Sequence, residues 1–271
     1  MKNYIVLLAL ACLMITTLEL QGQSKESRNV SGFTKVEFRI PGKLYLRQGS
    51  AEKVEIEASK EMLSRIETEV EGSRLIIETP GKFNWRSEDD DIKVYVTVKN
   101  LEALSASGSG DIIGESKFTT NDLALKVSGS GSLKIEFTSS GELDADVSGS
   151  GELIVKGTSK SLESSVSGSG RVDMDMMVSG KSDFAISGSG RIEAAGRTED
   201  VEITISGSGK VLAADLETKR CDVKISGSGN VEINVKEELD SHISGSGSVS
   251  YKGNPSKINN SASGSGTLRK M

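Results

Sequence analysis

The chain has 271 residues, of which 35% are hydrophobic and 27% charged, a balance typical of a globular protein rather than a disordered one. One His and two Cys exclude zinc fingers and disulfide frameworks, and a net charge of −6 argues against a nucleic-acid-binding protein. Aromatic residues make up only 4% while 30 residues are Gly, so we expect an aliphatic core with close backbone approach.

Residues 1–22 have the pattern of a signal peptide. Lys2 precedes an apolar or neutral stretch, Tyr4–Leu18, which is shorter than the roughly 20 residues of a membrane span. Gly22 offers a small residue for cleavage, and lipid attachment at Cys12 is the alternative. We therefore expect an exported protein, in the periplasm, at the outer surface or outside the cell, with no transmembrane segment once the leader is removed.

Residues 23–106 predict an N-terminal β cap. Short runs alternate apolar and polar residues, as half-buried strands do, at 33–40, 43–46, 53–58, 65–70, 74–79 and 92–98. One helical turn is predicted from Lys60. Residues 36–46 continue a single alternation through Gly42, like a degenerate first coil of a solenoid. Solenoids need atypical terminal units, so we expect this segment to be continuous with the rest of the chain.

Residues 107–271 contain one motif, Ser-Gly-Ser-Gly, at intervals of 18–21 residues. The nine copies begin at Ser107, Ser128, Ser148, Ser167, Ser187, Ser206, Ser226, Ser244 and Ser263. A fixed period of about 20 residues indicates a stack of repeated coils.

Strict alternation flanks each motif and predicts a strand on either side of it. Apolar residues and both motif glycines share one parity, for example Ile205, Gly207, Gly209 and Val211, so the simplest interpretation places both glycines inward and both serines outward. A positive φ within the motif would break this parity locally. The fold class predicted is all-β: a single-chain right-handed parallel β-helix with about 20 residues per coil and an atypical N-terminal β cap.

An acidic column is the candidate site. The residue four positions before the motif is acidic in six consecutive coils: Asp144, Glu163, Asp183, Glu202, Asp222 and Asp240. Stacked coils would place these carboxylates about 4.8 Å apart, where like charges repel. Two interpretations stay open. The charges suppress lateral aggregation of the sheet, or the column binds a divalent cation such as calcium or a cationic partner. No other cofactor is indicated.

A shorter basic stripe lies on the other side of the motif. Arg171, Arg191 and Lys210 stand four residues after the motif begins, in three adjacent coils. Asp173 and Glu193 stand two residues beyond the two arginines, so we expect these carboxylates to neutralise the stripe.

The C-terminal coil raises the question of an uncovered edge. It presents Ile258, Ala262 and Leu268 inward, and no helix or aromatic plug is predicted after Leu268. Because an uncovered strand edge pairs with another chain, we expect weak end-to-end self-association or docking of a partner strand. Arg269 and Lys270 would oppose it.

Two features of the sequence resemble a known family. They are the segments GFTKVEFRIPGKLYLRQGS (32–50), KVEIEAS (53–59) and IETEVEGSRLIIETP (66–80), and the segment LEALSASGSGDI (101–112) that leads into the repeats. Over essentially everything after the leader, the chain resembles the secreted bacterial family named auto-transporter adhesin, head GIN domain. The resemblance implies a right-handed β-helix and an adhesin-like role in a Gram-negative bacterium, and it implies no catalytic residues.

These observations together favour a non-enzymatic exported protein that binds a glycan or protein partner through flat outward faces. The alternative is a polysaccharide-active β-helix enzyme, a lyase or hydrolase, which needs carboxylates about 5–10 Å apart and an aromatic platform for sugar rings. The acidic column supplies carboxylates. The aromatic residues of the repeat are few, and three of them have inward parity: Phe118, Phe137 and Phe184.

Overall fold

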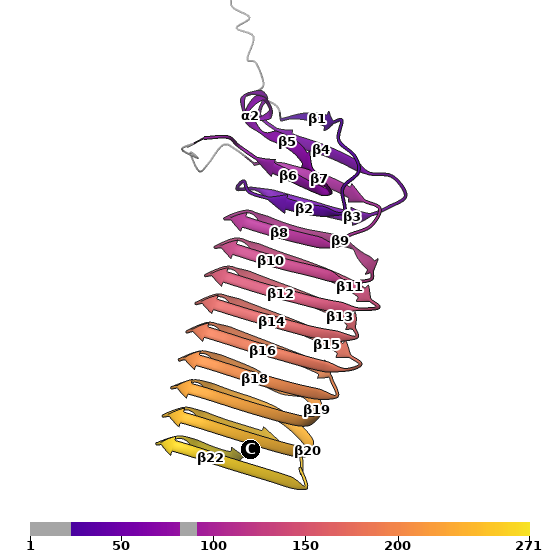
Figure 1. Cartoon of the computed structure of the whole chain (residues 1–271). Helices are drawn as coiled ribbons and strands as arrows, with labels where there is room; N and C mark the ends of the chain where they lie inside the picture. Colours follow the sequence, from indigo (N-terminus) through magenta and orange to yellow (C-terminus); the bar gives the residue numbers. More distant parts are fainter. Residues whose placement is uncertain (1–22, 82–90) are drawn as a thin grey trace, which may run out of the picture.

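The computed structural model describes residues 23–81 and 91–271 (Figure 1). The predicted signal peptide, and Cys12 within it, lie outside the described residues. The described chain forms a stack of β coils with a β cap at the N-terminal end and the C-terminus at the opposite end (Figure 1).

Each coil consists of one strand before the Ser-Gly-Ser-Gly motif and one strand after it. We call the two resulting faces the pre-motif sheet and the post-motif sheet. The pre-motif sheet contains β2 (Lys35–Phe38), β8 (Ala103–Gly108), β10 (Leu123–Gly129), β12 (Glu142–Gly149), β14 (Ser161–Gly168), β16 (Lys181–Gly188), β18 (Asp200–Gly207), the second halves of β19 (Lys210–Gly227) and β20 (Asn230–Gly245), and β22 (Lys257–Gly264). The post-motif sheet contains β3 (Lys43–Gln48), β9 (Asp111–Thr120), β11 (Ser132–Ser139), β13 (Glu152–Ser159), β15 (Arg171–Val178), β17 (Arg191–Arg197), the first halves of β19 and β20, β21 (Ser248–Lys252) and β23 (Thr267–Lys270). All neighbours within these two sets pair in parallel, which confirms the predicted parallel β-helix.

The cap joins the first coil through both sheets. β2 pairs in parallel with both β6 (Arg74–Glu78) and β8, while β3 pairs in parallel with both β7 (Lys93–Val98) and β9. The remaining cap strands, β1 (Ser24–Arg28), β4 (Lys53–Ala58) and β5 (Glu67–Glu71), pair antiparallel with their neighbours. The cap therefore changes strand direction at the end of the stack.

A short helix, α2 (Lys60–Arg65), lies at the N-terminal end, where one helical turn was predicted (Figure 1). Ser59 caps it, because the Ser59 hydroxyl accepts a hydrogen bond from the Met62 backbone N–H. Its residues Met62 and Leu63 are buried and belong to the same continuous core as the coils. The helix thus contributes to closing the core at this end.

The core is a set of columns in which each apolar side chain stacks on its equivalent in the next coil. Val147, Val166, Ile186 and Ile205 form one such column in register, and each is at most 2% exposed. Burial alternates along strands inside the stack such as β12 and β16, as the sequence parity predicts. Burying such aliphatic side chains contributes about 1.5–3 kcal/mol each.

The two glycines of each motif have different roles, so the prediction that both point inward is wrong for the first. The second glycine is inward: a Cβ on Gly209 would lie 2.4 Å from Cγ2 of Ile186. The first glycine forms the corner with φ near +110° to +120°; Gly207 has φ +119°. A Cβ on Gly207 would point along the stack and lie 2.6 Å from the carbonyl oxygen of Gly188 in the preceding coil.

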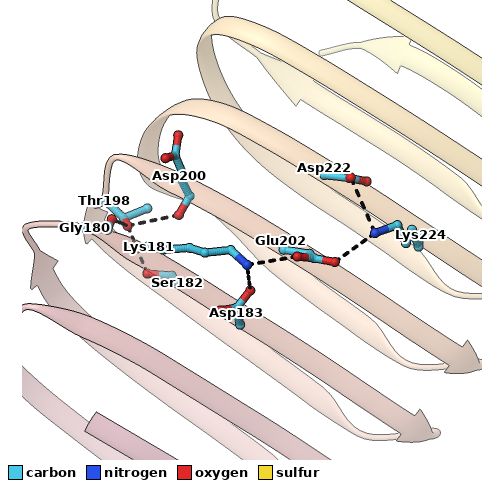
Figure 2. A network of polar contacts seen from close by, with 9 residues as sticks. All are labelled: Gly180, Lys181, Ser182, Asp183, Thr198, Asp200, Glu202, Asp222 and Lys224. Atoms are coloured by element: carbon cyan, nitrogen blue, oxygen red, sulfur yellow. Dashed lines mark hydrogen bonds and ion pairs between the residues drawn. The ribbon is translucent and has the colours of Figure 1, made fainter. Parts of the chain in front are cut away.

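Hydroxyl side chains line the second corner, where each coil returns from the post-motif to the pre-motif sheet. Thr198 Oγ1 donates to the carbonyl of Gly180 at 2.8 Å, and Thr218 Oγ1 donates to that of Glu199 at 3.0 Å. Figure 2 shows Thr198 with Gly180. These bonds satisfy corner carbonyls that lie between the two sheets, so Thr198 and Thr218 each link their coil to the one before it.

The C-terminal coil has one paired side in the described structure. β22 pairs with β20, and β23 pairs with β21. All eight residues of β22 are exposed, including Ile258 at 42%. The self-association expected for this end stays a prediction.

The corner geometry predicts that Gly207→Ala destabilises the protein strongly, whereas Ser208→Ala is nearly neutral. The alanine would combine an unfavourable positive φ, costing about 1–3 kcal/mol, with a clash against the Gly188 carbonyl. Ser208 is exposed. Urea denaturation of both variants measures the two free energies of unfolding; an equal or larger loss for Ser208→Ala would contradict the corner role of the first glycine.

Candidate functional site

The structure places the six predicted acidic residues side by side in one outward column of the pre-motif sheet. Register pairs Asp144 with Glu163, and each subsequent member with the next, as far as Asp240. The same column continues toward the cap through Ala124, Ala103, Lys35 and Arg74. The column therefore carries cations at its cap end, then two alanines, then six carboxylates.

Lysines from neighbouring outward positions neutralise the middle of the acidic column (Figure 2). Lys181 Nζ lies 2.6 Å from Asp183 and 3.0 Å from Glu202, and Lys224 Nζ lies 2.9 Å from Glu202 and 3.5 Å from Asp222. Each lysine thus bridges two carboxylates of adjacent coils. These bridges were not predicted from the sequence, although Lys181 and Lys224 stand two positions from acidic column members in the chain.

The bridging lysines shift the pKa of Glu202 furthest. Hydrogen bonds from Lys224 and Lys181 lower the pKa of this carboxyl from 4.5 to about 2. The same contacts raise the pKa of both lysines. At neutral pH this part of the column is a chain of ion pairs rather than an array of free carboxylates.

The cap-proximal part of the column has the opposite character. Among the described residues, no cation lies within 4 Å of the carboxylates of Asp144 or Glu163, and the same holds for Glu142 beside them. Burial raises the pKa of the Asp144 carboxyl, with smaller contributions from the charges of Asp146, Glu163 and Glu142, and the charge of Lys126 opposes this rise in part. The negative charge of the column is therefore least compensated next to the cap.

The calcium hypothesis for Asp144, Glu163, Asp183, Glu202, Asp222 and Asp240 stays a prediction. Over residues 23–81 and 91–271, no three or more His, Cys, Asp or Glu side chains group closely enough to hold a metal ion. The column members lie one per coil, about 4.8 Å apart along the stack, and lysines occupy the gaps in the middle. A melting temperature that rises with calcium more than with sodium at matched ionic strength would support the hypothesis.

A groove of about 980 Å³ adjoins the uncompensated carboxylates, at the junction between cap and repeat. We call it the junction groove. Cap residues Lys35 and Arg74 line one end and Glu142 and Asp144 the other, and the corner residues of the first coils form a wall rich in hydroxyl and amide groups. The sequence pattern gives no sign of the groove, because cap and repeat residues far apart in the chain build it.

The post-motif sheet carries the predicted short basic stripe of Arg171, Arg191 and Lys210 in register. Arg171 lies 3.2 Å from Asp173 and 3.1 Å from Glu193, and Arg191 lies 3.1 Å from Glu193. As the sequence indicated, acidic neighbours neutralise the arginines of this stripe, so this face has less uncompensated charge than the junction groove.

Cys221 is buried at 3% exposure within a core column. Burial raises the pKa of its thiol far above the ordinary value, so the thiol stays protonated and behaves as a small apolar group. Its position gives no candidate nucleophile.

Comparison with known families identifies the fold family. The model of the family described as "Putative auto-transporter adhesin, head GIN domain" matches residues 32–194 and 175–255. The chain belongs to this family. The resemblance inferred from the N-terminal segments and the repeat is therefore confirmed.

Solved structures share the head GIN domain architecture. The chain resembles a putative lipid binding protein from Parabacteroides distasonis, with 23% identity, a TM-score of 0.71, and coverage of 92% of this chain and 97% of that one. It also resembles a putative adhesin from Parabacteroides merdae, with 20% identity, a TM-score of 0.72, and coverage of 92% and 96%. At these identities the likeness shows the fold. No curated protein matches the chain.

Within the part of this head GIN domain protein that the structure describes, no helix has the length and apolar character needed to cross a membrane. The family name is consistent with a protein of the cell surface or exterior.

The opposite pKa shifts in the two parts of the column predict opposite responses to charge removal. Glu202→Gln should lower the melting temperature at pH 7 by about 1–8 °C, because it removes two ion pairs that solvent screening limits to about 0.2–1 kcal/mol each. The loss should shrink as pH falls from 4.5 through about 2, where the wild-type carboxyl protonates.

Asp144→Asn should raise the melting temperature at pH 7, because ionised Asp144 is disfavoured in the folded state. The gain should vanish as pH falls below the ordinary Asp value of 3.8, where the carboxyl is protonated in both folded and unfolded states. Differential scanning fluorimetry from pH 2 to pH 8 compares both variants with the wild type. Equal shifts of the same sign would contradict the division of the column.

Proposed function

We propose that the protein is an exported, non-enzymatic, adhesin-like binding protein that contacts a glycan or protein partner through its outward faces. The observation that carries the proposal is the register. Equivalent residues stay outward in coil after coil, as the column from Asp144 to Asp240 illustrates, and this gives each sheet a long regular surface. The adhesin name of the family, and of a solved structure with the same fold, supports the proposal.

A filled interior also supports binding at the surface. The inward columns form one continuous core from the cap to the last coils, with side chains such as Phe38, Phe137 and Phe184 at 2% exposure or less. Because side chains fill the interior of the β-helix, a ligand of appreciable size would bind to the outer faces or to the junction groove. The same reasoning applies to a lipid, the ligand class named for the Parabacteroides distasonis protein.

The competing enzyme hypothesis rests on the carboxylates. Glu142 and Asp144 are two positions apart on one outward face, so their backbones lie about 7 Å apart, within the range used by glycosidases. The aromatic ring pair on the post-motif side, Tyr45 and Tyr95, stacks ring against ring at 5.4 Å, and Lys25 covers Tyr95 at 4.4 Å. These rings are already in contact with protein groups and do not flank the carboxylates, which favours binding over catalysis.

A glycan array and a turnover assay on the same polysaccharides test the proposal. The purified protein should bind at least one glycan or surface protein saturably and leave polymer length unchanged over many hours. Shortening of a polysaccharide that is lost in a Glu142→Gln variant, but kept in a Glu238→Gln variant, would overturn the proposal in favour of an enzyme.

A further inference from the structure

The junction groove owes its shape to two alanines. In the outward column that runs from Arg74 to Asp240, Ala103 and Ala124 stand between Lys35 and Asp144. Three strand spacings separate the backbones of Lys35 and Asp144, about 14 Å. Over this length only two methyl groups project from this column, and the next outward column carries Ser105 and Lys126. The hollow has a small apolar floor bounded by charged side chains at both ends.

The cations at the cap end of the groove are already partnered. Lys35 Nζ lies 3.9 Å from Glu102, which also accepts a hydrogen bond of 3.0 Å from Thr34, and Arg74 lies 3.6 Å from Glu37. Because both cations already have carboxylate partners, neither is the main attraction for an anionic ligand. These contacts also use up Glu102, one of the four carboxylates that line the groove.

The other three carboxylates have no cation within 4 Å in the described structure, and the charge of Lys126 on β10 acts on Asp144 from farther away. Asp122 accepts a hydrogen bond of 2.9 Å from the Glu142 backbone N–H, which holds its carboxylate beside Glu142. Glu142 and Asp144 share one outward face of β12. Among the lining residues that the structure describes, four carboxylates stand against two cations, a net charge of −2, and the carboxylates without an ion pair lie at the end formed by β12.

We propose that the junction groove binds an arginine-bearing extended segment of a protein partner. The aliphatic stem of the arginine lies over Ala103 and Ala124, and its guanidinium is held by the carboxylates of Glu142 and Asp144. Arginine suits this site because its stem packs on apolar surface while its planar head pairs with carboxylates. The inference rests on the proposed function as a binding protein and names the chemistry of one partner.

The lining of the groove favours a protein segment over a sugar. Sugar rings in binding sites stack on aromatic faces, and none of the lining residues within the described ranges 23–81 and 91–271 is aromatic. The wall instead offers backbone and side-chain groups of Thr119, Asn121 and Ser140, which suit the amides of an extended chain. Ser140 Oγ already donates to Asn121 Oδ1 at 3.0 Å, so part of this wall is ordered in the free protein.

Fluorescence anisotropy with a labelled peptide tests the inference. The probe contains three arginines separated by glycines, and the comparison probe replaces each arginine by citrulline, which has the same shape without the charge. We expect the arginine peptide to bind saturably, and the citrulline peptide to bind at least tenfold more weakly, because charged hydrogen bonds would be lost.

Two pairs of variants locate the site. The double variant Glu142→Gln/Asp144→Asn should weaken binding at least tenfold, whereas Asp183→Asn/Glu202→Gln, with the same change in net charge on the same sheet, should change it less than twofold. Ala124→Leu fills the floor without altering charge and should also weaken binding at least tenfold. Its control is Ala185→Leu, another exposed outward position of the pre-motif sheet. Circular dichroism verifies that all four proteins are folded.

If a variant and its control weaken binding of the arginine peptide equally, the proposed binding site is wrong. It is also wrong if the arginine and citrulline peptides bind with equal affinity. Displacement of the peptide by a glucosamine oligomer that binds more tightly would overturn the assignment to a protein segment. The glycan array described above separates this inference from the proposed function. If the Ala124→Leu variant still binds a glycan found on the array, the proposed function is supported and the groove is not its binding site. If the arginine peptide binds in the groove but no glycan on the array binds the protein, the groove is supported and the proposed function is not.

Discussion

The whole architecture depends on the close approach of successive coils at the glycine corner. A Cβ at Gly207 would lie 2.6 Å from the carbonyl oxygen of Gly188, and one at Gly188 would lie equally close to that of Gly168. One added methyl group would therefore separate two coils and disturb the backbone hydrogen bonds there, such as Ser208 N–H to Gly188 O at 2.9 Å. Because the glycine corners hold successive coils at this distance, they also fix the register that places each residue beside its equivalent in the next coil.

Register fixed by the corners has opposite consequences for apolar and charged residues. A column such as Val147, Val166 and Ile186 gains packing from stacking like on like, whereas a column of carboxylates gains repulsion. The protein relieves this repulsion with Lys181 and Lys224, each placed between two coils. These bridges reach Asp183, Glu202 and Asp222 but neither Glu163 nor Asp144, so the cap-proximal end of the column differs electrostatically from its middle.

Sequence periodicity was sufficient to predict the features that repeat. The β-helix, the facing of its strands and the adjacency of six acidic residues follow from period and parity, and the register confirms them. Parity failed at the first motif glycine, because a positive φ turns the backbone out of the alternation that parity assumes. It also gave no sign of β1, an edge strand of mostly exposed polar residues, Ser24–Arg28, whose pairing with β4 is set by the cap. The lysine bridges and the groove depend on side chains that meet across coils, and alternation does not encode those contacts.

A regular stack offers the same outward position in each coil, so it cannot by itself single out one place for a ligand. A binding site that occurs at one place only needs a break in the repeat, and the clearest break is where the cap meets the coils. There the acidic column changes to Ala124, Ala103, Lys35 and Arg74 within four strand spacings, and the last two come from β2 and β6 of the cap region. Repeat and cap both supply lining residues of the groove, and neither could form it alone. The residues that end the repetition therefore both complete the fold and create an outward place where shape and charge differ from those of the regular coils.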